Sequence, residues 1–391
     1  VTGRNGQLYN LIINQNSNSR GMDPVYIITV ASGGFYTTIE NSLHIISGTA
    51  RMGDDDVTNY TKLGHVFIGA SGTFSAGDVT DVNNAGYNNW DSSGSIFMKS
   101  VIFSGTNSVF VGNGGTITFT GPYSGNGSDH YVWENPDLGT YYHNSGTIQF
   151  GGGTVYGPGE TSGYGSYINW KNSDRPADSS AQTSRGDGGW FYNVSGGFTD
   201  ADAGDRHFGL QVVGSNTIKI VNDLSLMVSG AMSATTYNAV VSGNVFLDED
   251  TYWGYYGTQG GTKSIGSLNL QANSYFKAPT GTLTITDLTE GSYAIKVDAD
   301  ADFYHNSGTI LCAKIAGGVQ ELWMEGQDLY NLNIAPVGGT IVYISNNSPG
   351  LTVANDLNVT AGKTFKTFGA GNSRPLTVGG IATISGTLGV A

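Results

Sequence analysis

Charged side chains are scarce in this sequence, and positive ones are the scarcest. Asp, Glu, Lys and Arg make up 12% of the 391 residues, which is about half of their usual share. The chain has 17 Lys and Arg against 31 Asp and Glu, and its formal net charge is −14. Binding to a phosphate backbone requires clustered Lys and Arg. We therefore expect no nucleic-acid partner.

Cysteine and long apolar runs are also nearly absent. The single cysteine, Cys312, excludes a framework of intrachain disulfides. Its neighbours Ile310, Leu311 and Ile315 predict a small buried side chain rather than a nucleophile. No apolar run approaches the roughly 18 residues of a membrane-spanning helix, so we expect no membrane span. The nucleophile elbow, the phosphate-binding loop and the dinucleotide-binding fingerprint do not occur in the sequence.

Glycine and aromatic residues are, by contrast, abundant. The chain has 60 Gly, 22 Tyr and 16 Phe. Disordered chains lack recurrent aromatic and branched apolar residues, so this composition argues against disorder. Helical periodicity is almost absent, whereas apolar and polar residues alternate in short runs between Gly, Asn, Ser and Asp. This pattern predicts an all-β protein made of short strands.

Several phrases of the sequence occur twice. Residues 303–310 read FYHNSGTI and residues 141–148 read YYHNSGTI. The other pairs are GQDLYNLNI at 326–334 with GQLYNLII at 6–13, and ANDLNV at 354–359 with VNDLSL at 221–226. Copies of this length indicate stacked supersecondary units.

Two architectures fit these units: a parallel β-solenoid, also called a β-helix, and a series of tandem antiparallel β-sandwiches. The solenoid is favoured because copies of one unit recur with variable spacers and the strands are short. We expect solenoid coils over residues 1–121 and 207–391. The range 122–206 is less regular and contains the polar stretch Asn172–Arg206. It is expected to be an irregular insertion rich in aromatic residues, Gly, Ser and Asp.

The repeated phrases, together with LTVANDLNVTAG and LTVGGIATISGTL, resemble the right-handed parallel β-helix repeats of known surface proteins. These are large proteins of bacterial and archaeal cell surfaces and of phage virions and fibres. The resemblance covers residues 1–50 and 207–391 well and the middle poorly. It implies a structural or adhesive extracellular protein. Because the shared motifs are structural, it implies no catalytic residue.

One acidic segment is a candidate metal site. Val297–Phe303 alternates apolar residues with Asp298, Asp300 and Asp302, so a strand would place the three carboxylates on one face. Carboxylates in a row repel one another unless they are hydrated or bridged by a hard cation such as Ca²⁺. A solvated outer face is the simpler interpretation, and no other cofactor is expected.

Aromatic and histidine residues supply two further candidates. Trp133, Trp170 and Trp190 of the middle range are candidates for stacking on sugars, although packing onto the body explains them at least as well. His143 and His305 occupy equivalent positions of the YHNSGTI phrase and have no second His nearby. Repetition of a structural unit explains these two histidines better than metal binding does.

The expected function is that of a non-enzymatic, extracellular structural protein, a self-associating subunit of a filament, fibre or virion surface. A carbohydrate-active β-helix enzyme, either a polysaccharide lyase or a glycoside hydrolase, is one alternative. Glycoside cleavage needs two carboxylates across the bond, and nothing in the sequence singles out a pair. A glycan-binding adhesin with cell-surface glycans as partners is another alternative.

The two ends of the sequence predict where copies would meet. The GQLYNLII phrase at the start is the closing half of a unit, and the sequence stops in a strand-like segment without a polar cap. Open solenoid ends template pairing with another chain. We expect head-to-tail contact, with the alternative that flanking coils of a longer protein cover both ends. The predicted contact residues are Leu8, Tyr9, Leu11, Ile13, Ile384 and Leu388.

Overall fold

The computed structural model describes most of the second half of the chain and separate segments of the first half. The described residues are 7–15, 25–27, 38–52, 61–76, 96–105, 107–112, 114–119, 123–124, 130–135, 139–143, 145–150, 166–170, 191–196, 208–212, 218–226, 230–232, 239–254, 260–288, 292–314, 318–337, 341–369 and 373–390. All regular structure in these residues is β-strand.

The chain separates into two compact units. The first contains Val1–Gly196 and Phe208–Asn216, and the second contains Gly197–His207 and Thr217–Ala391. Strands in both units pair in parallel with strands of the preceding and following coils. The only antiparallel pair in the described residues is β8 (Tyr123–Ser124) with β9 (His130–Asn135). The predicted parallel β-solenoid is therefore confirmed, and the tandem antiparallel sandwiches are excluded for these residues.

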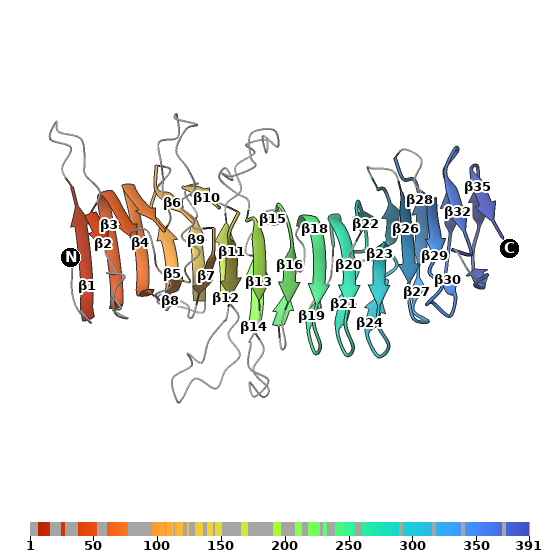
Figure 1. Cartoon of the computed structure of the whole chain (residues 1–391), viewed down its shortest axis with the longest axis horizontal. Coiled ribbons are helices and arrows are strands. Elements are labelled where there is room, and N and C mark those ends of the chain that lie inside the picture. Colours follow the sequence, from red (N-terminus) through yellow and green to blue (C-terminus); the bar gives the residue numbers. More distant parts are fainter. Residues whose placement is uncertain are drawn as a thin grey trace. The chain divides into compact units, whose positions relative to one another are not determined.

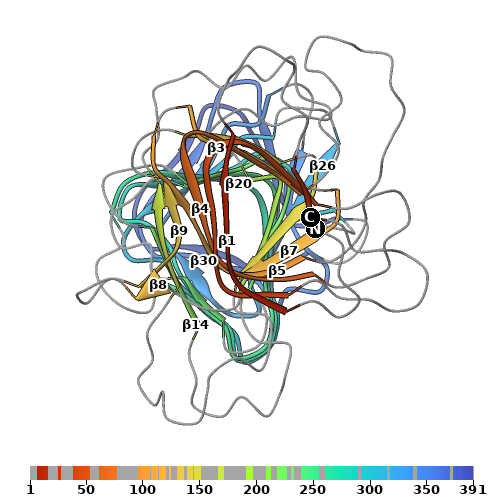
Figure 2. The ribbon, with the colours of Figure 1, turned by 90° about the vertical axis from the view of Figure 1, so that its left-hand side faces the viewer.

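The first unit begins with long parallel strands. β1 (Gln7–Asn14) pairs with β3 (Thr38–Met52), β3 pairs with β4 (Thr61–Ser75), and β4 pairs with β5 (Ile96–Phe103). Figure 2 shows β1, β3 and β4 one behind another. The remaining strands of this unit are β2 (Val25–Ile27), β6 (Val109–Val111), β7 (Thr116–Phe119), β10 (Thr140–Tyr142), β11 (Thr147–Phe150), β12 (Ser166–Trp170), β13 (Asn193–Gly196) and β14 (Phe208–Val212).

Described parts of the range 122–206 are strands of this regular body. β10 pairs in parallel with β6, β11 pairs with β7 and β13, and β12 pairs with β9 and β14. These strands continue the parallel pairing of the neighbouring coils, and the irregular insertion stays a prediction for the rest of the range. The alternation of these strands is hard to recognise in the sequence. Polar stretches separate the strands, and only a few large aromatic residues occupy inward positions. Most of Asn172–Arg206 lies outside the described residues.

The second unit has a regular three-strand coil. One face stacks β22, β25, β28, β31 and β34, a second stacks β23, β26, β29, β32 and β35, and a third stacks β27, β30 and β33. Figure 1 shows these strands in teal to blue. Their bounds are β15 (Ile218–Ile220), β16 (Leu224–Leu226), β17 (Gly230–Met232), β18 (Ala239–Leu247), β19 (Tyr252–Trp253), β20 (Lys263–Leu270), β21 (Tyr275–Lys277), β22 (Thr282–Ile285), β23 (Tyr293–Val297), β24 (Asp302–Tyr304), β25 (Thr309–Cys312), β26 (Val319–Trp323), β27 (Asp328–Leu329), β28 (Asn331–Ile334), β29 (Ile341–Ile344), β30 (Leu351–Val353), β31 (Leu357–Val359), β32 (Thr364–Lys366), β33 (Leu376–Val378), β34 (Ala382–Ile384) and β35 (Thr387–Gly389).

Each unit has a buried core of aromatic and aliphatic side chains. In the first unit Trp133 is fully buried, and its ring centroid lies 4.9 Å from that of Tyr141 and 5.2 Å from that of Phe191. In the second unit aliphatic residues form inward rows, such as Ile310, Leu332 and Leu357 on consecutive strands of one face. Burying each such side chain stabilises the fold by about 1.5–3 kcal/mol.

The YHNSGTI phrase forms a tight corner between two strands. The His143 ring nitrogen Nδ1 accepts the Ser145 backbone N–H at 2.9 Å, and His305 accepts that of Ser307 at 3.0 Å. Both serines have left-handed φ angles, 58° and 55°. The repeated histidines thus close a turn inside the chain, which is the structural explanation that the sequence favoured.

The NDL phrase links one coil to the next. An Asp223 carboxylate oxygen accepts the backbone N–H of Asn244 at 2.7 Å, and Asp356 accepts that of Ile381 at 2.9 Å. In both cases a glycine precedes the donor residue. Only a residue without a side chain fits there: a Cβ on Gly243 would lie 2.6 Å from the Asn222 carbonyl oxygen.

Candidate self-association surface

The last described coil exposes apolar side chains at positions that the preceding coil buries. Val359 is fully buried, whereas Ile384, its register partner on β34, is 37% exposed. Phe365 is likewise fully buried, while its partner Leu388 on β35 is half-buried. The inward row of the solenoid core therefore continues into this coil, where no further described coil covers it.

Two more apolar residues enlarge this surface. Ile381 and Val390 are each 69% exposed. β33, β34 and β35 each have one parallel neighbour in the part of the chain that the structure describes. We call Ile381, Ile384, Leu388 and Val390 the terminal apolar surface. A further parallel strand, from a continuation of this polypeptide or from another copy, would cover these residues.

The first strand of the first unit offers a second open edge. β1 pairs only with β3 among the described strands. Tyr9 is 67% exposed and Ile12 is 63% exposed, whereas Leu8 and Leu11 are half-buried. Ile13 is buried within its own unit at 4% exposure. Of the predicted N-terminal contact residues, Tyr9 therefore has the most accessible side chain and Ile13 has almost none.

The predicted row of three aspartates is interrupted by a turn. β23 ends at Val297 and β24 begins at Asp302, and between them Asp300 has a left-handed φ of 65°. The Asp298 carboxylate forms an ion pair with Lys296 at 2.9 Å. The continuous strand expected over Val297–Phe303 is therefore wrong, because alternation across a corner looks like alternation along a strand. No group of three His, Cys, Asp or Glu suited to a metal ion occurs among the described residues.

The three tryptophans proposed for sugar stacking have different places. Trp133 lies in the core with no exposed surface, so its ring cannot stack on a sugar at the surface. Packing, the competing interpretation, holds for this residue. Trp170 ends β12, and nothing is described of its side chain, while Trp190 lies outside the described residues.

Three core residues have pKa values shifted by burial. Burial raises the pKa of the Cys312 thiol to about 12, lowers that of Lys263 to about 8 and lowers that of His143 to about 4. Complete burial of Cys312 confirms its predicted role as a small apolar side chain. Desolvation causes these shifts. Buried structural residues show such shifts as well as catalytic ones, so the shifts do not identify an active site.

Comparison with known proteins gives no relative. No family model, no curated protein and no solved structure matches the chain. Among the described residues no helix has the length and hydrophobicity needed to cross a membrane. Function must therefore be argued from the surfaces of the molecule itself.

Proposed function

We propose that this chain is a non-enzymatic structural protein whose copies stack head to tail in an extracellular filament, fibre or virion surface. The observation that supports the proposal is the terminal apolar surface, where no described coil covers the inward row of the solenoid core. The resemblance of the repeats to β-helix surface proteins supports the extracellular setting and the absence of catalysis.

Parallel stacking favours a second copy as the occupant of this surface. Every coil of the second unit lies against the next through parallel strands, so a strand added beyond β34 and β35 continues the same geometry. The open edge of β1 offers such a parallel strand from another copy. This contact joins two different surfaces, so it propagates into an open filament unless the rotation closes it into a ring.

Burial of the terminal apolar surface supplies the driving force. Each large aliphatic side chain transferred from water contributes about 1.5–3 kcal/mol. Main-chain hydrogen bonds between the added strands contribute direction and register. A lysine at Ile384 or Leu388 would place a charge inside the new core, where it has no partner.

The test is the assembly state of the purified chain. We expect light scattering after size-exclusion chromatography, and negative-stain electron microscopy, to show concentration-dependent linear oligomers. Ile384→Lys and Leu388→Lys should each reduce the assembly to monomers, and so should deletion of Val1–Asn14. Val337→Lys is the matched control, because Val337 is 55% exposed in the same unit but lies away from β34 and β35.

Two results would contradict the proposal. One is a native chain that stays monomeric at high concentration, in which case adjoining coils of a longer polypeptide are the natural cover for this surface. The other is assembly that persists unchanged in Ile384→Lys and Leu388→Lys while both variants keep the native circular dichroism spectrum.

A further inference from the structure

One outer face of the second unit carries aromatic and polar side chains in register across consecutive coils. It is formed by β20, β23, β26 and β29, and we call it the β26 face. Asn269, Lys296 and Trp323 are register partners on three adjacent strands. Tyr293, Glu321 and Tyr343 form a second row beside them. These side chains alternate with buried residues such as Ile295 and Leu322, so they point outward.

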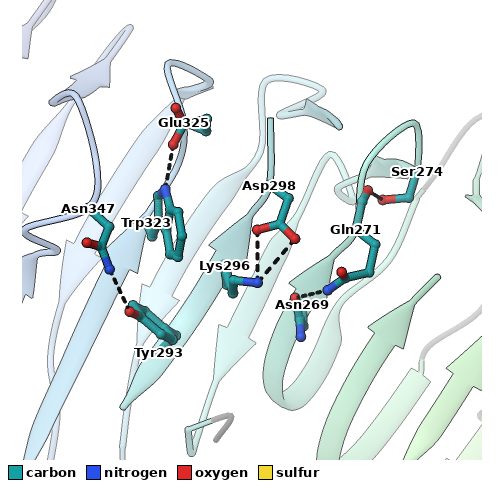
Figure 3. Close-up of polar contacts among 9 residues, drawn as sticks. All are labelled: Asn269, Gln271, Ser274, Tyr293, Lys296, Asp298, Trp323, Glu325 and Asn347. Atoms are coloured by element: carbon teal, nitrogen blue, oxygen red, sulfur yellow. Dashed lines mark hydrogen bonds and ion pairs between the residues drawn. The ribbon is translucent and has the colours of Figure 1, made fainter. Parts of the chain in front are cut away.

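Trp323 lies on this face close to Lys296, Tyr293 and Glu325 (Figure 3). Its indole N–H donates to the Glu325 carboxylate at 2.6 Å. The Lys296 ammonium lies 5.3 Å from the centroid of the Trp323 ring, and the Tyr293 ring lies 5.5 Å from it. Both contacts come from the preceding coil. In the next coil Leu322 pairs with Ile344, so the position beside Trp323 is occupied by the small side chain of Ser345. A half-buried indole is thus fixed in orientation by its neighbours.

Hydrogen-bond donors and acceptors lie on the same face as this ring. Lys296 pairs with Asp298, and the Asn347 amide donates to the Tyr293 hydroxyl at 3.0 Å. The Gln271 amide donates to Asn269 at 3.1 Å. Each of these contacts uses only part of the capacity of its groups, because an ammonium has three donors and a carboxylate or amide oxygen accepts more than one bond. The face therefore presents spare donors and spare acceptors side by side.

A hydroxylated, uncharged ligand matches this arrangement. A sugar hydroxyl donates and accepts at once, so it can satisfy a carboxylate and an ammonium in the same row, while the C–H face of a sugar ring packs on the indole. The positive charge of Lys296 is outnumbered at this face by the carboxylates of Asp298, Glu321 and Glu325. A polyanion gains little from such a face and is repelled by the net charge of −14. An apolar peptide would leave the polar groups unpaired.

We propose that the β26 face binds a neutral polysaccharide chain, with Trp323 as the stacking platform and Lys296, Glu325 and Asn269 as hydroxyl-binding groups. Successive coils repeat about every 4.8 Å, so outward rows offer contacts to an extended ligand lying across several strands. This site differs from the tryptophans that the sequence suggested for stacking. The proposal is independent of self-association, because it concerns a side face rather than the terminal apolar surface.

Affinity electrophoresis tests the proposal with defined probes. Native gels would contain mixed-linkage β-glucan, xylan or galactomannan, and a further gel would contain polygalacturonate as the polyanion. We expect at least one neutral polysaccharide to retard the chain. Trp323→Ala should raise the dissociation constant by about tenfold or more, as truncation of a central aromatic anchor does. Lys296→Met, which keeps the packing of the side-chain stem on Trp323, should also weaken binding.

Tyr304→Ala is the matched control. Tyr304 is 50% exposed and has a lysine, Lys277, 5.6 Å from its ring centroid, but it lies on β24, outside the β26 face. Its removal should leave retardation unchanged. Four results would overturn the proposal: no retardation by any neutral probe, retardation by polygalacturonate alone, equal loss in Tyr304→Ala, or full binding by a folded Trp323→Ala and Lys296→Met pair. None of these results depends on whether the chain assembles.

Discussion

The YHNSGTI turn occurs twice, and its histidine lies in a different environment in each copy. His143 is fully buried, and its ring lies 5.2 Å from that of Tyr192, tilted by 36°. His305 is half-buried beside Tyr304 and Tyr330. Both rings accept a backbone N–H two residues later, so the turn requires only a neutral acceptor at this position. Burial, rather than the turn itself, decides what protonation costs.

The pKa of His143 predicts an acid-sensitive first unit. Burial lowers this pKa from 6.5 to about 4. Between those values the unfolded chain binds a proton that the folded chain does not, so the contribution of His143 is full above pH 6.5 and is lost as the pH falls toward 4. His143→Asn keeps an acceptor for the turn and removes the titration. We expect the urea midpoint of this variant to change less between pH 7 and about pH 5 than that of the native chain.

A matched substitution separates titration from the loss of a turn residue. His305→Asn makes the same change in the same turn without removing a fully buried imidazole, so it measures the effect of replacing the turn acceptor alone. Burial also lowers the pKa of His65 to about 4. His65 is present in both variants, so the stability of each should still depend on pH to some extent. If the urea midpoint of His143→Asn changed with pH as much as that of the native chain, the proposed contribution of His143 to the pH dependence of stability would be wrong.

At the scale of the element, the coil-to-coil contacts depend on a carboxylate facing a glycine. Asp223 accepts the N–H of Asn244, and Gly243 lies against the same carboxylate and the Asn222 carbonyl. Asp356, Gly380 and Ile381 repeat this arrangement near the C-terminal strands. The recurring contact therefore joins the aspartate of the NDL phrase in one coil to a glycine in the next coil. The repeated phrase contains the aspartate but not the glycine.

Adding one methyl group at Gly243 should break this contact. An alanine Cβ there would lie 2.6 Å from a backbone oxygen that cannot rotate away. We expect Gly243→Ala to lower the free energy of unfolding by about 1–3 kcal/mol, the usual cost of overpacking. Gly260→Ala is the control, because nothing lies within 4 Å of a Cβ at that position. Chemical denaturation of both variants measures the difference, and equal stability would contradict the steric argument.

Several of these elements could be predicted from the sequence, and others could not. Alternation and repeated phrases correctly indicated parallel coils, and apolar neighbours correctly indicated a buried Cys312. The interior position of Trp133 depends on partners such as Phe103 and Phe191 from distant strands, so the local sequence did not reveal it. The β26 face was missed for the same reason. Lys296 and Trp323 are neighbours only through the register of β23 and β26.

At the scale of the whole molecule, each unit has a core of its own. Trp133 occupies the centre of an aromatic cluster in the first unit, with Phe110 at 5.6 Å and Tyr141 at 4.9 Å between ring centroids. In the second unit Trp253 is also fully buried and contacts Phe276 at 5.5 Å. Solenoid coils contact mainly their neighbours, so stability is approximately a sum of local terms.

Because coils contact mainly their neighbours, we expect a cavity in the core of one unit to leave the stability of the other unit unchanged. Removing a buried indole costs about 3–5 kcal/mol, which is enough to open the surrounding coils. We expect Trp133→Ala to raise amide hydrogen exchange in β5, β7, β10 and β11 while β26, β29 and β32 keep their native protection. Trp253→Ala is the reciprocal variant and should act on β19, β21 and β24 while sparing β5 and β7. If either variant accelerated exchange throughout both units, the chain would unfold as one cooperative body, and the additive description of its coils would be wrong.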